Sequence, residues 1–172
     1  METFHSIDEA IAFLRENMHI SEVSADFPDA ARFLGLSKDE IALAPLLEAL
    51  SRGSSYMRAA AANGLGFLGR HEAIPALIKA FLEDPGLYVR SDAALALGRL
   101  GSDESLQHFI RRFPQEYFEV QKRILMAISS INTNKAGMAL EAIEEMIPRL
   151  DMSESARETL RAIAQQKPRL VA

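Results

Sequence analysis

Three stretches of this chain share one pattern: MRAAAANGLGFLG (57–69), VRSDAALALGRLG (89–101) and VQKRILMAISSIN (120–132). The second stretch follows the first at an offset of 32 residues, and the third follows the second at an offset of 31. Within each stretch the apolar residues recur at intervals of three and four, which is the spacing of one face of an α-helix. A second set of helical segments alternates with the first set: IALAPLLEAL (41–50), AIPALIKAF (73–81), SLQHFIRRF (105–113) and MALEAIEEMI (138–147). Each repeat unit is therefore predicted to be a pair of helices.

Glycines recur at equivalent places of the copies. Gly69 and Gly101 directly follow the last periodic residue, where a helix end favours a positive φ angle, and Asn132 stands in that place in the third copy. Gly66 and Gly98 lie inside the helices, where a larger side chain would hold a neighbouring helix away. We expect the second helices of consecutive units to pack closely against one another.

The repeats predict an all-α solenoid. A single helix pair cannot bury its apolar face alone, so stacked neighbours must share a continuous core. We predict about five helix pairs in one domain over residues 1–172, with capping helices at both ends and no β-strands. Within this domain, residues 1–38 form a divergent acidic N-terminal cap, residues 39–132 form clear repeats, and residues 133–172 form a divergent C-terminal repeat and cap.

The units resemble the HEAT repeat, and in particular the short HEAT-like repeat of phycocyanobilin lyases and related proteins. VRSDAALALGRLG and HEAIPALIKAF carry this resemblance, which is strong over residues 41–132. It is limited to the period over residues 133–166 and is nearly absent over residues 1–38. The resemblance implies a right-handed α-solenoid whose concave face is lined by the second helix of each pair. It also implies a role in binding another macromolecule.

Composition disfavours several classes of protein. The chain has 172 residues, a net charge of −5, four histidines and no cysteine. Without cysteine there is no disulfide and no thiolate metal site, and we expect a cytoplasmic protein without a secretion signal. The negative net charge argues against binding to nucleic acid or to an anionic membrane surface. The longest apolar run, residues 41–47, is far shorter than the ~20 residues that span a bilayer.

The histidines and carboxylates suggest one weak metal site. Imidazole and carboxylate groups can bind divalent metals, and the best cluster combines His71, Asp103, Glu104 and His108. Acidic residues in the first turn of a helix are also expected from capping alone, and we favour that interpretation. We therefore predict no catalytic residue, no metal and no cofactor.

Comparison of the copies with one another locates a candidate binding site. In the stacked array, some positions that should face away from the core hold large apolar residues, with arginines beside them. An exposed apolar surface with an arginine rim is typical of a protein-binding patch. The predicted contact residues are Asn63, Phe67, Leu95, Arg99, Arg123 and Met126. The alternative is that these residues belong to the core, because the helical phase differs by one position or because residues 1–38 cover them.

Charge is distributed unevenly along the chain. Residues 1–50 have a net charge of −7, whereas residues 51–172 have a net charge of +2. One interpretation is a basic patch that attracts the acidic cap or an acidic ligand, formed by Arg58, Arg90, Arg99, Arg111, Arg112, Lys122 and Arg123. The interpretation that we favour is a solvated cap, with Arg58 and Arg90 paired to nearby carboxylates such as Glu83 or Asp84.

These observations predict a non-enzymatic scaffold or adaptor that binds a partner protein on the concave face. The alternative is a phycobilin lyase-like or chromophore-protein-handling factor that uses the same face. In that case a bilin or a chromophore-bearing protein would contact Phe67, Leu95, Arg99 and Met126. Neither prediction involves nucleic acid or a membrane.

Overall fold

The computed structural model describes residues 4–20 and 26–166, and in these ranges it contains helices and no β-strand. Residues 167–172 of the predicted C-terminal cap lie outside the described residues. The α-helices are α1 (Ile7–Glu16), α2 (Asp26–Ser37), α3 (Leu43–Arg52), α4 (Ser55–Leu68), α5 (Ile74–Glu83), α6 (Leu87–Arg99), α7 (Ser105–Arg112), α8 (Phe118–Ser130), α9 (Asn134–Met146) and α10 (Glu154–Ala164). Short 3-10 turns adjoin four of them: η1 (Glu40–Ala42), η2 (His71–Ala73), η3 (Phe113–Gln115) and η4 (Ile147–Arg149). Among the described helices, none is both long and apolar enough to cross a membrane.

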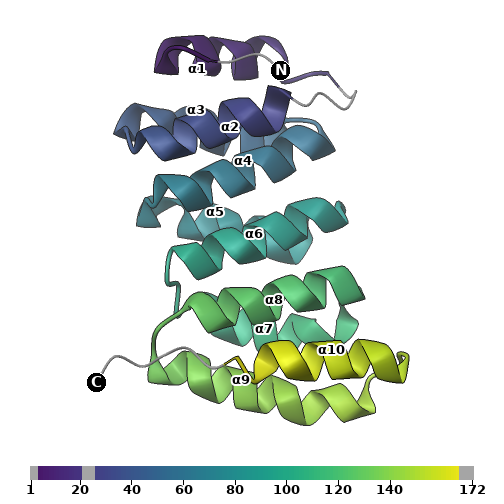
Figure 1. Ribbon diagram of the computed structural model, residues 1–172. Coiled ribbons are helices and arrows are strands. Elements are labelled where there is room, and N and C mark those ends of the chain that lie inside the picture. The colour runs from purple at the N-terminus through teal and green to yellow at the C-terminus, as the bar shows by residue number, and fades with distance from the viewer. Residues whose placement is uncertain (1–3, 21–25, 167–172) are drawn as a thin grey trace.

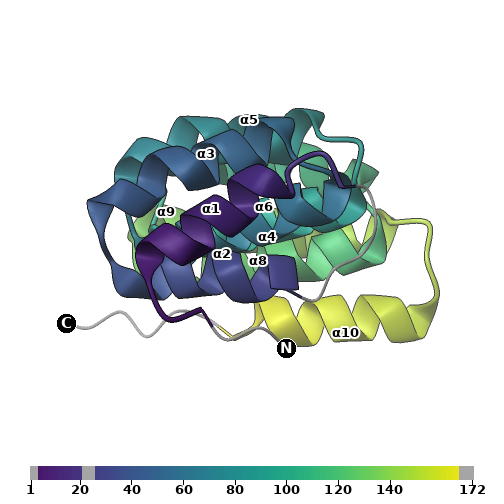
Figure 2. The same ribbon diagram turned by 90° about the horizontal axis from the view of Figure 1, so that it is seen from above.

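The helices form two layers that run along one stack (Figures 1 and 2). One layer holds the first helices of the pairs, α1, α3, α5, α7 and α9. The other holds the second helices, in which α4 packs on α2, α6 on α4, α8 on α6, and α10 on α8. The apolar faces of both layers meet in a continuous core, where Phe81 of α5 and Phe109 of α7 pack edge to face with ring centroids 5.1 Å apart. The predicted α-solenoid of helix pairs is confirmed.

The N-terminal helices continue the stack and do not fold over it. Helix α1 packs on α2 and α3, and α2 packs on α4. Figure 1 looks onto the second helices, and no other described helix crosses in front of α4, α6 or α8. In the described part of the chain, residues 1–38 therefore leave the solvent side of these three helices open.

Consecutive second helices approach one another through glycine. A Cβ atom on Gly66 of α4 would lie 2.7 Å from Cα of Ala96 in α6, and one on Gly98 would lie 2.6 Å from Cα of Ala127 in α8. Real Cβ atoms do not come this close to backbone, so each glycine is required by the contact. The predicted packing role of Gly66 and Gly98 is confirmed.

Two of the three predicted helix ends adopt the expected conformation. Gly69 has a φ of 80° and Gly101 a φ of 64°, as predicted. The prediction for Asn132 is wrong, because α8 ends at Ser130 and Ile131 is already extended, with φ −84° and ψ 113°. The extended segment leads directly to Thr133, whose side chain caps α9 by accepting a hydrogen bond from the Ala136 amide.

The Gly98 contact predicts the effect of a single methyl group. Gly98→Ala should lower the free energy of unfolding by about 2 kcal/mol, because overpacking against Ala127 outweighs the gain in helix propensity. Gly137→Ala in α9 is the matched control, since a Cβ there would meet nothing within 4 Å. The control should be more stable than the wild type by up to about 1 kcal/mol. Urea unfolding measures both, and a Gly98→Ala protein as stable as the Gly137→Ala protein contradicts the prediction.

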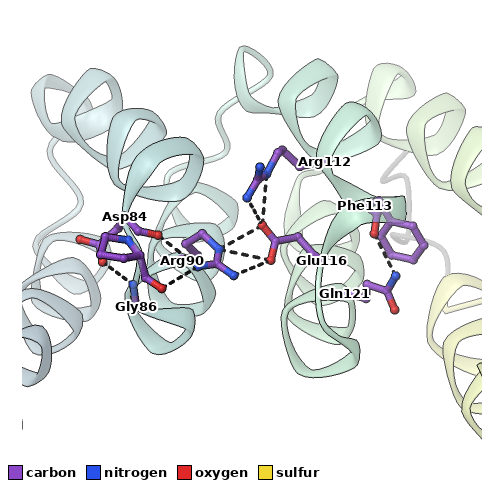
Figure 3. A network of polar contacts seen from close by, with 8 residues as sticks. Asp84, Gly86, Arg90, Arg112, Phe113, Glu116 and Gln121 are labelled. Atoms are coloured by element: carbon purple, nitrogen blue, oxygen red, sulfur yellow. Dashed lines mark hydrogen bonds and ion pairs between the residues drawn. The ribbon is translucent and has the colours of Figure 1, made fainter.

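An arginine and a carboxylate join consecutive units at the start of the second helices. Arg58 Nε lies 2.7 Å from an Asp84 carboxylate oxygen, and Arg90 Nε lies 3.0 Å from Glu116 Oε1, with Nη2 2.9 Å from Oε2. The two pairs are equivalent, because both partners are displaced by 32 residues along the chain. Arg90 also donates to the carbonyls of Asp84 and Pro85, and Arg112 donates to Glu116 (Figure 3).

These contacts decide between the two interpretations of the arginines. The predicted pairing of Arg58 with Asp84 is confirmed. Arg90 also pairs with a carboxylate, as predicted, but its partner is Glu116 of the following unit, and it contacts only the main chain of Asp84. Arg58, Arg90 and Arg112 are bound internally, so the basic patch proposed from the sequence does not include them.

The pair does not recur in the third copy. Gln121 of α8 occupies the place of Arg90, and its Nε2 donates to the carbonyl oxygen of Phe113 at 2.9 Å (Figure 3). A neutral side chain therefore takes the position of the arginine where the regular repeats end.

The buried carboxylate predicts a large effect on stability. Glu116→Gln should lower the free energy of unfolding by about 3 kcal/mol, because it leaves the buried Arg90 guanidinium without a compensating charge. Glu154 is a matched control, since it also binds two arginines, Arg157 and Arg161, but lies exposed. Glu154→Gln should change stability little. Equal losses in the two variants, measured by chemical unfolding, would show that burial does not set the effect.

Candidate functional site

The solvent side of the second helices forms one continuous surface, which we call the second-helix face. On α6, after its first residue Leu87, the residues that are not buried recur at intervals of three and four: Tyr88, Asp92, Leu95 and Arg99. The corresponding residues on α4 and α8 occupy the same register, because both helices are copies of the same repeat. The first helices cover the opposite side of this layer, so the second-helix face is directed to solvent (Figure 2).

The structure places all six predicted contact residues on this face. Asn63 and Phe67 of α4, Leu95 of α6 and Arg123 of α8 are half-buried, and Arg99 is exposed. The Met126 side chain of α8 is 47% exposed. Asn63, Leu95 and Met126 are equivalent repeat positions, so they form a row across three adjacent helices.

Arg99 links α6 to α4. Its Nη1 donates a hydrogen bond to Asn63 Oδ1 at 2.7 Å, and its guanidinium carbon lies 4.2 Å from the centre of the Phe67 ring. The ring face is the electron-rich side of phenylalanine, so this contact is a cation–π interaction. Arg99 is therefore held in one orientation by two side chains of the neighbouring unit.

Asp92 lies near the arginines of the face and was not predicted from the sequence. Burial raises the pKa of Asp92 from its ordinary value of 3.8 to about 6, and the nearby charges of Arg123 and Arg99 oppose this rise. Burial lowers the pKa of Arg99, and Asp92 counteracts that change. The signal was present in the repeat comparison, because Asp92 stands where the other copies have Ala60 and Arg123.

Leu36 of α2 extends the apolar part of the face. Gly35 lies against Gly64 of α4 in the way that Gly66 lies against Ala96, so Leu36 occupies the place that Phe67 holds in the next unit. The Leu36 side chain is 52% exposed. Sequence comparison missed it because residues 1–38 do not show the repeat pattern.

Neither the weak candidate metal cluster nor a cavity in the other layer competes with this face as a site. Asp103 accepts a hydrogen bond from Thr133 and pairs with Lys135, and the described residues contain no group of three His, Cys, Asp or Glu side chains that could hold a metal. A cavity of about 460 Å³ lies between α3 and α5 in the other layer. Its lining includes Arg58 and Asp84, which already bind one another.

Stacked helix pairs with a shared face of second helices define an α-solenoid repeat protein. The family model for HEAT repeats matches residues 43–129, which is half of the chain. The chain therefore belongs to the HEAT-repeat family, as the sequence resemblance implied.

Among solved structures, the chain is similar to one in the complex of CpcE and CpcF of phycocyanin lyase from Nostoc sp. PCC7120. The TM-score is 0.69 at 26% sequence identity, over 99% of this chain. The match covers 66% of the neighbour, so this chain spans slightly less than two thirds of its length. No curated protein matches the chain at a significant level.

The raised pKa of Asp92 predicts a pH dependence of stability. Between pH 4 and pH 6 the native state binds more protons at Asp92 than the unfolded state does, so its contribution to stability falls as pH rises through this range. The expected decrease is about 2 kcal/mol. Asp92→Asn should lack this decrease. The free energy of unfolding of the variant, relative to that of the wild type, should therefore rise between pH 4 and pH 6 and keep the higher value at pH 7. Urea unfolding at four pH values measures the difference, and a difference that does not change with pH contradicts the prediction.

Proposed function

We propose that the chain is a non-enzymatic scaffold or adaptor that binds a partner protein on the second-helix face. The supporting observation is the arrangement of half-buried and exposed apolar side chains around a fixed arginine. The proposed contact residues are Asn63, Phe67, Leu95, Arg99, Arg123 and Met126. Apolar side chains next to arginine are enriched at the centres of protein interfaces.

The rigid stack favours tight binding with few contacts. Arg99 is already oriented by Asn63 and Phe67, so it loses little conformational freedom when a partner binds. Leu95 and Met126 lie side by side on adjacent helices and offer apolar area that a partner would remove from water. A small number of such central residues carries most of the binding energy in known interfaces.

The comparisons support a protein as the ligand. The similar structure is a complex of two protein chains, CpcE and CpcF. Repeat solenoids expose an extended surface that is suited to binding another macromolecule. A protein ligand also fits the net charge of −5, which disfavours nucleic acid.

A capture experiment from the native source tests this proposal. The variant Phe67→Glu, Leu95→Glu and Met126→Glu should retain less than a tenth of the partner that the wild-type chain captures, because three charges would enter an apolar contact. Captured proteins are quantified by mass spectrometry, and circular dichroism checks that the variant is folded.

A matched variant controls for added charge. Ile41→Glu, Tyr117→Glu and Met138→Glu introduces the same three charges at exposed side chains, none of which lies among the proposed contacts. This variant should capture the partner as the wild type does. If the triple variant at Phe67, Leu95 and Met126 is folded and still captures the partner, the binding site lies elsewhere.

A second candidate function is the handling of a bilin or a chromophore-bearing protein. The structural similarity to the complex of phycocyanin lyase favours it. The same face would bind the ligand, with the arginines beside an acidic, extended pigment and the apolar side chains along its length. Visible absorbance of the chain purified from its native source separates this function from that of a scaffold.

A further inference from the structure

On the second-helix face, Arg123 is a cation that has no direct partner in the part of the chain that the structure describes. Within the described residues its guanidinium makes no hydrogen bond and no ion pair within 4 Å, whereas Arg58, Arg90 and Arg112 are all bound to carboxylates. It interacts electrostatically with Asp92 and Arg99. Arg123 is half-buried as a residue, but its guanidinium nitrogens are not among the buried polar atoms without a partner, so its donors are open to solvent and available to an anion.

The repeat geometry places this cation beside apolar side chains. Arg123 occupies on α8 the position that Asp92 occupies on α6, and Met126 occupies the position of Leu95. Helices α6 and α8 touch through Gly98 and Ala127, so equivalent positions lie about one helix spacing apart, on the order of 8–10 Å. One carboxylate, that of Asp92, therefore faces two arginines, and the cluster carries a net positive charge.

We propose that the partner protein presents an acidic side chain next to an apolar one, and that its carboxylate binds between Arg123 and Arg99 in competition with Asp92. The apolar neighbour of that carboxylate contacts Leu95 and Met126. This inference rests on the proposed function, because it states which chemistry the second-helix face selects. Asp92 is a positioning residue that sets how strongly the face attracts an anion.

The charge balance explains why an acidic and apolar segment fits better than another ligand. A neutral segment would leave the excess positive charge of the two arginines uncompensated, and a basic segment would add to it. Two cations on an apolar surface are too few to bind a nucleic acid backbone, which requires many phosphate contacts. A carboxylate with an adjacent apolar side chain satisfies both parts of the surface at once.

A pair of dyes tests the charge preference. The first is 1-anilinonaphthalene-8-sulfonate, an apolar anion, and the second is N-phenyl-1-naphthylamine, which has the same rings without the sulfonate. Asp92→Asn should tighten binding of the anion about fivefold, and Arg123→Gln should weaken it about fivefold, because each changes one charge close to the ligand. Binding of the neutral dye should be the same in both variants, and fluorescence titration at pH 7.5 measures all six affinities.

Two charge-matched variants control for the global change in net charge. Arg111→Gln on α7 and Glu145→Gln on α9 alter exposed residues outside the second-helix face, and both should bind the anion as the wild type does. If Asp92→Asn leaves the affinity for the anion unchanged or weakens it, the proposal is overturned. The same holds if the controls shift the affinity as much as the variants of the face.

Selection from a displayed library of random peptides tests the kind of occupant. Peptides bound by the full chain should be enriched in Asp or Glu next to Leu, Phe or Met, and Arg123→Gln should abolish this enrichment. Enrichment without acidic residues overturns the proposal. Self-association of the wild type that Arg123→Gln abolishes would assign the face to a second copy of the chain, which also overturns it.

These results are independent of the capture experiment. If the triple variant at Phe67, Leu95 and Met126 no longer captures the partner, and Asp92→Asn captures it as the wild type does, the proposed function is supported and the acidic preference is refuted. If the face prefers acidic ligands but the triple variant still captures the partner, the acidic preference is supported and the proposed function is refuted.

Discussion

The close contact between consecutive second helices is the constraint on which the rest of the structure depends. At Gly66 and Gly98 the backbones approach so closely that a methyl group on either glycine would overlap the facing alanine. Such a contact fixes the relative position of two helices, because backbone atoms cannot move aside as side chains do. Residues at equivalent repeat positions are then held side by side. The register of the repeats in the sequence therefore becomes the arrangement of side chains on the second-helix face.

Buried charge adds a restraint that packing alone does not supply. Arg90 binds the carbonyls of Asp84 and Pro85 before its own helix and the carboxylate of Glu116 in the next unit. Buried ion pairs add little net stability, since desolvation offsets most of the attraction, but they disfavour arrangements in which either charge is left unpaired. The Arg58 and Arg90 pairs thus specify the alignment of successive units. Gln121 ends the series, and the helices that follow pack without it.

The sequence predicted the helix pairs, the close contacts at glycine and the position of the six contact residues on one face of the second helices, because all of these depend on the repeat period alone. Long charged side chains were harder to predict. Arg90 binds a carboxylate 26 residues away, and only the assembled stack brings the two together. Asn132 does not end its helix as a glycine would, since the chain must extend to let Thr133 cap α9. Asp92 was missed because its importance comes from its burial and from two arginines of different helices.

The contacts of Arg99 also determine which apolar side chains of the second-helix face are open to a partner. The guanidinium covers part of the Phe67 ring, which is one reason that this ring is only half-buried and not fully exposed. A partner would therefore meet Leu95 and Met126 first, and Phe67 would act mainly by orienting Arg99. Arg99 and Arg123 differ in how firmly the neighbouring side chains hold them. Arg99 is held by two side chains and could define the direction of a ligand, whereas Arg123, which has no direct partner among the described residues, would contribute affinity in the proposed complex.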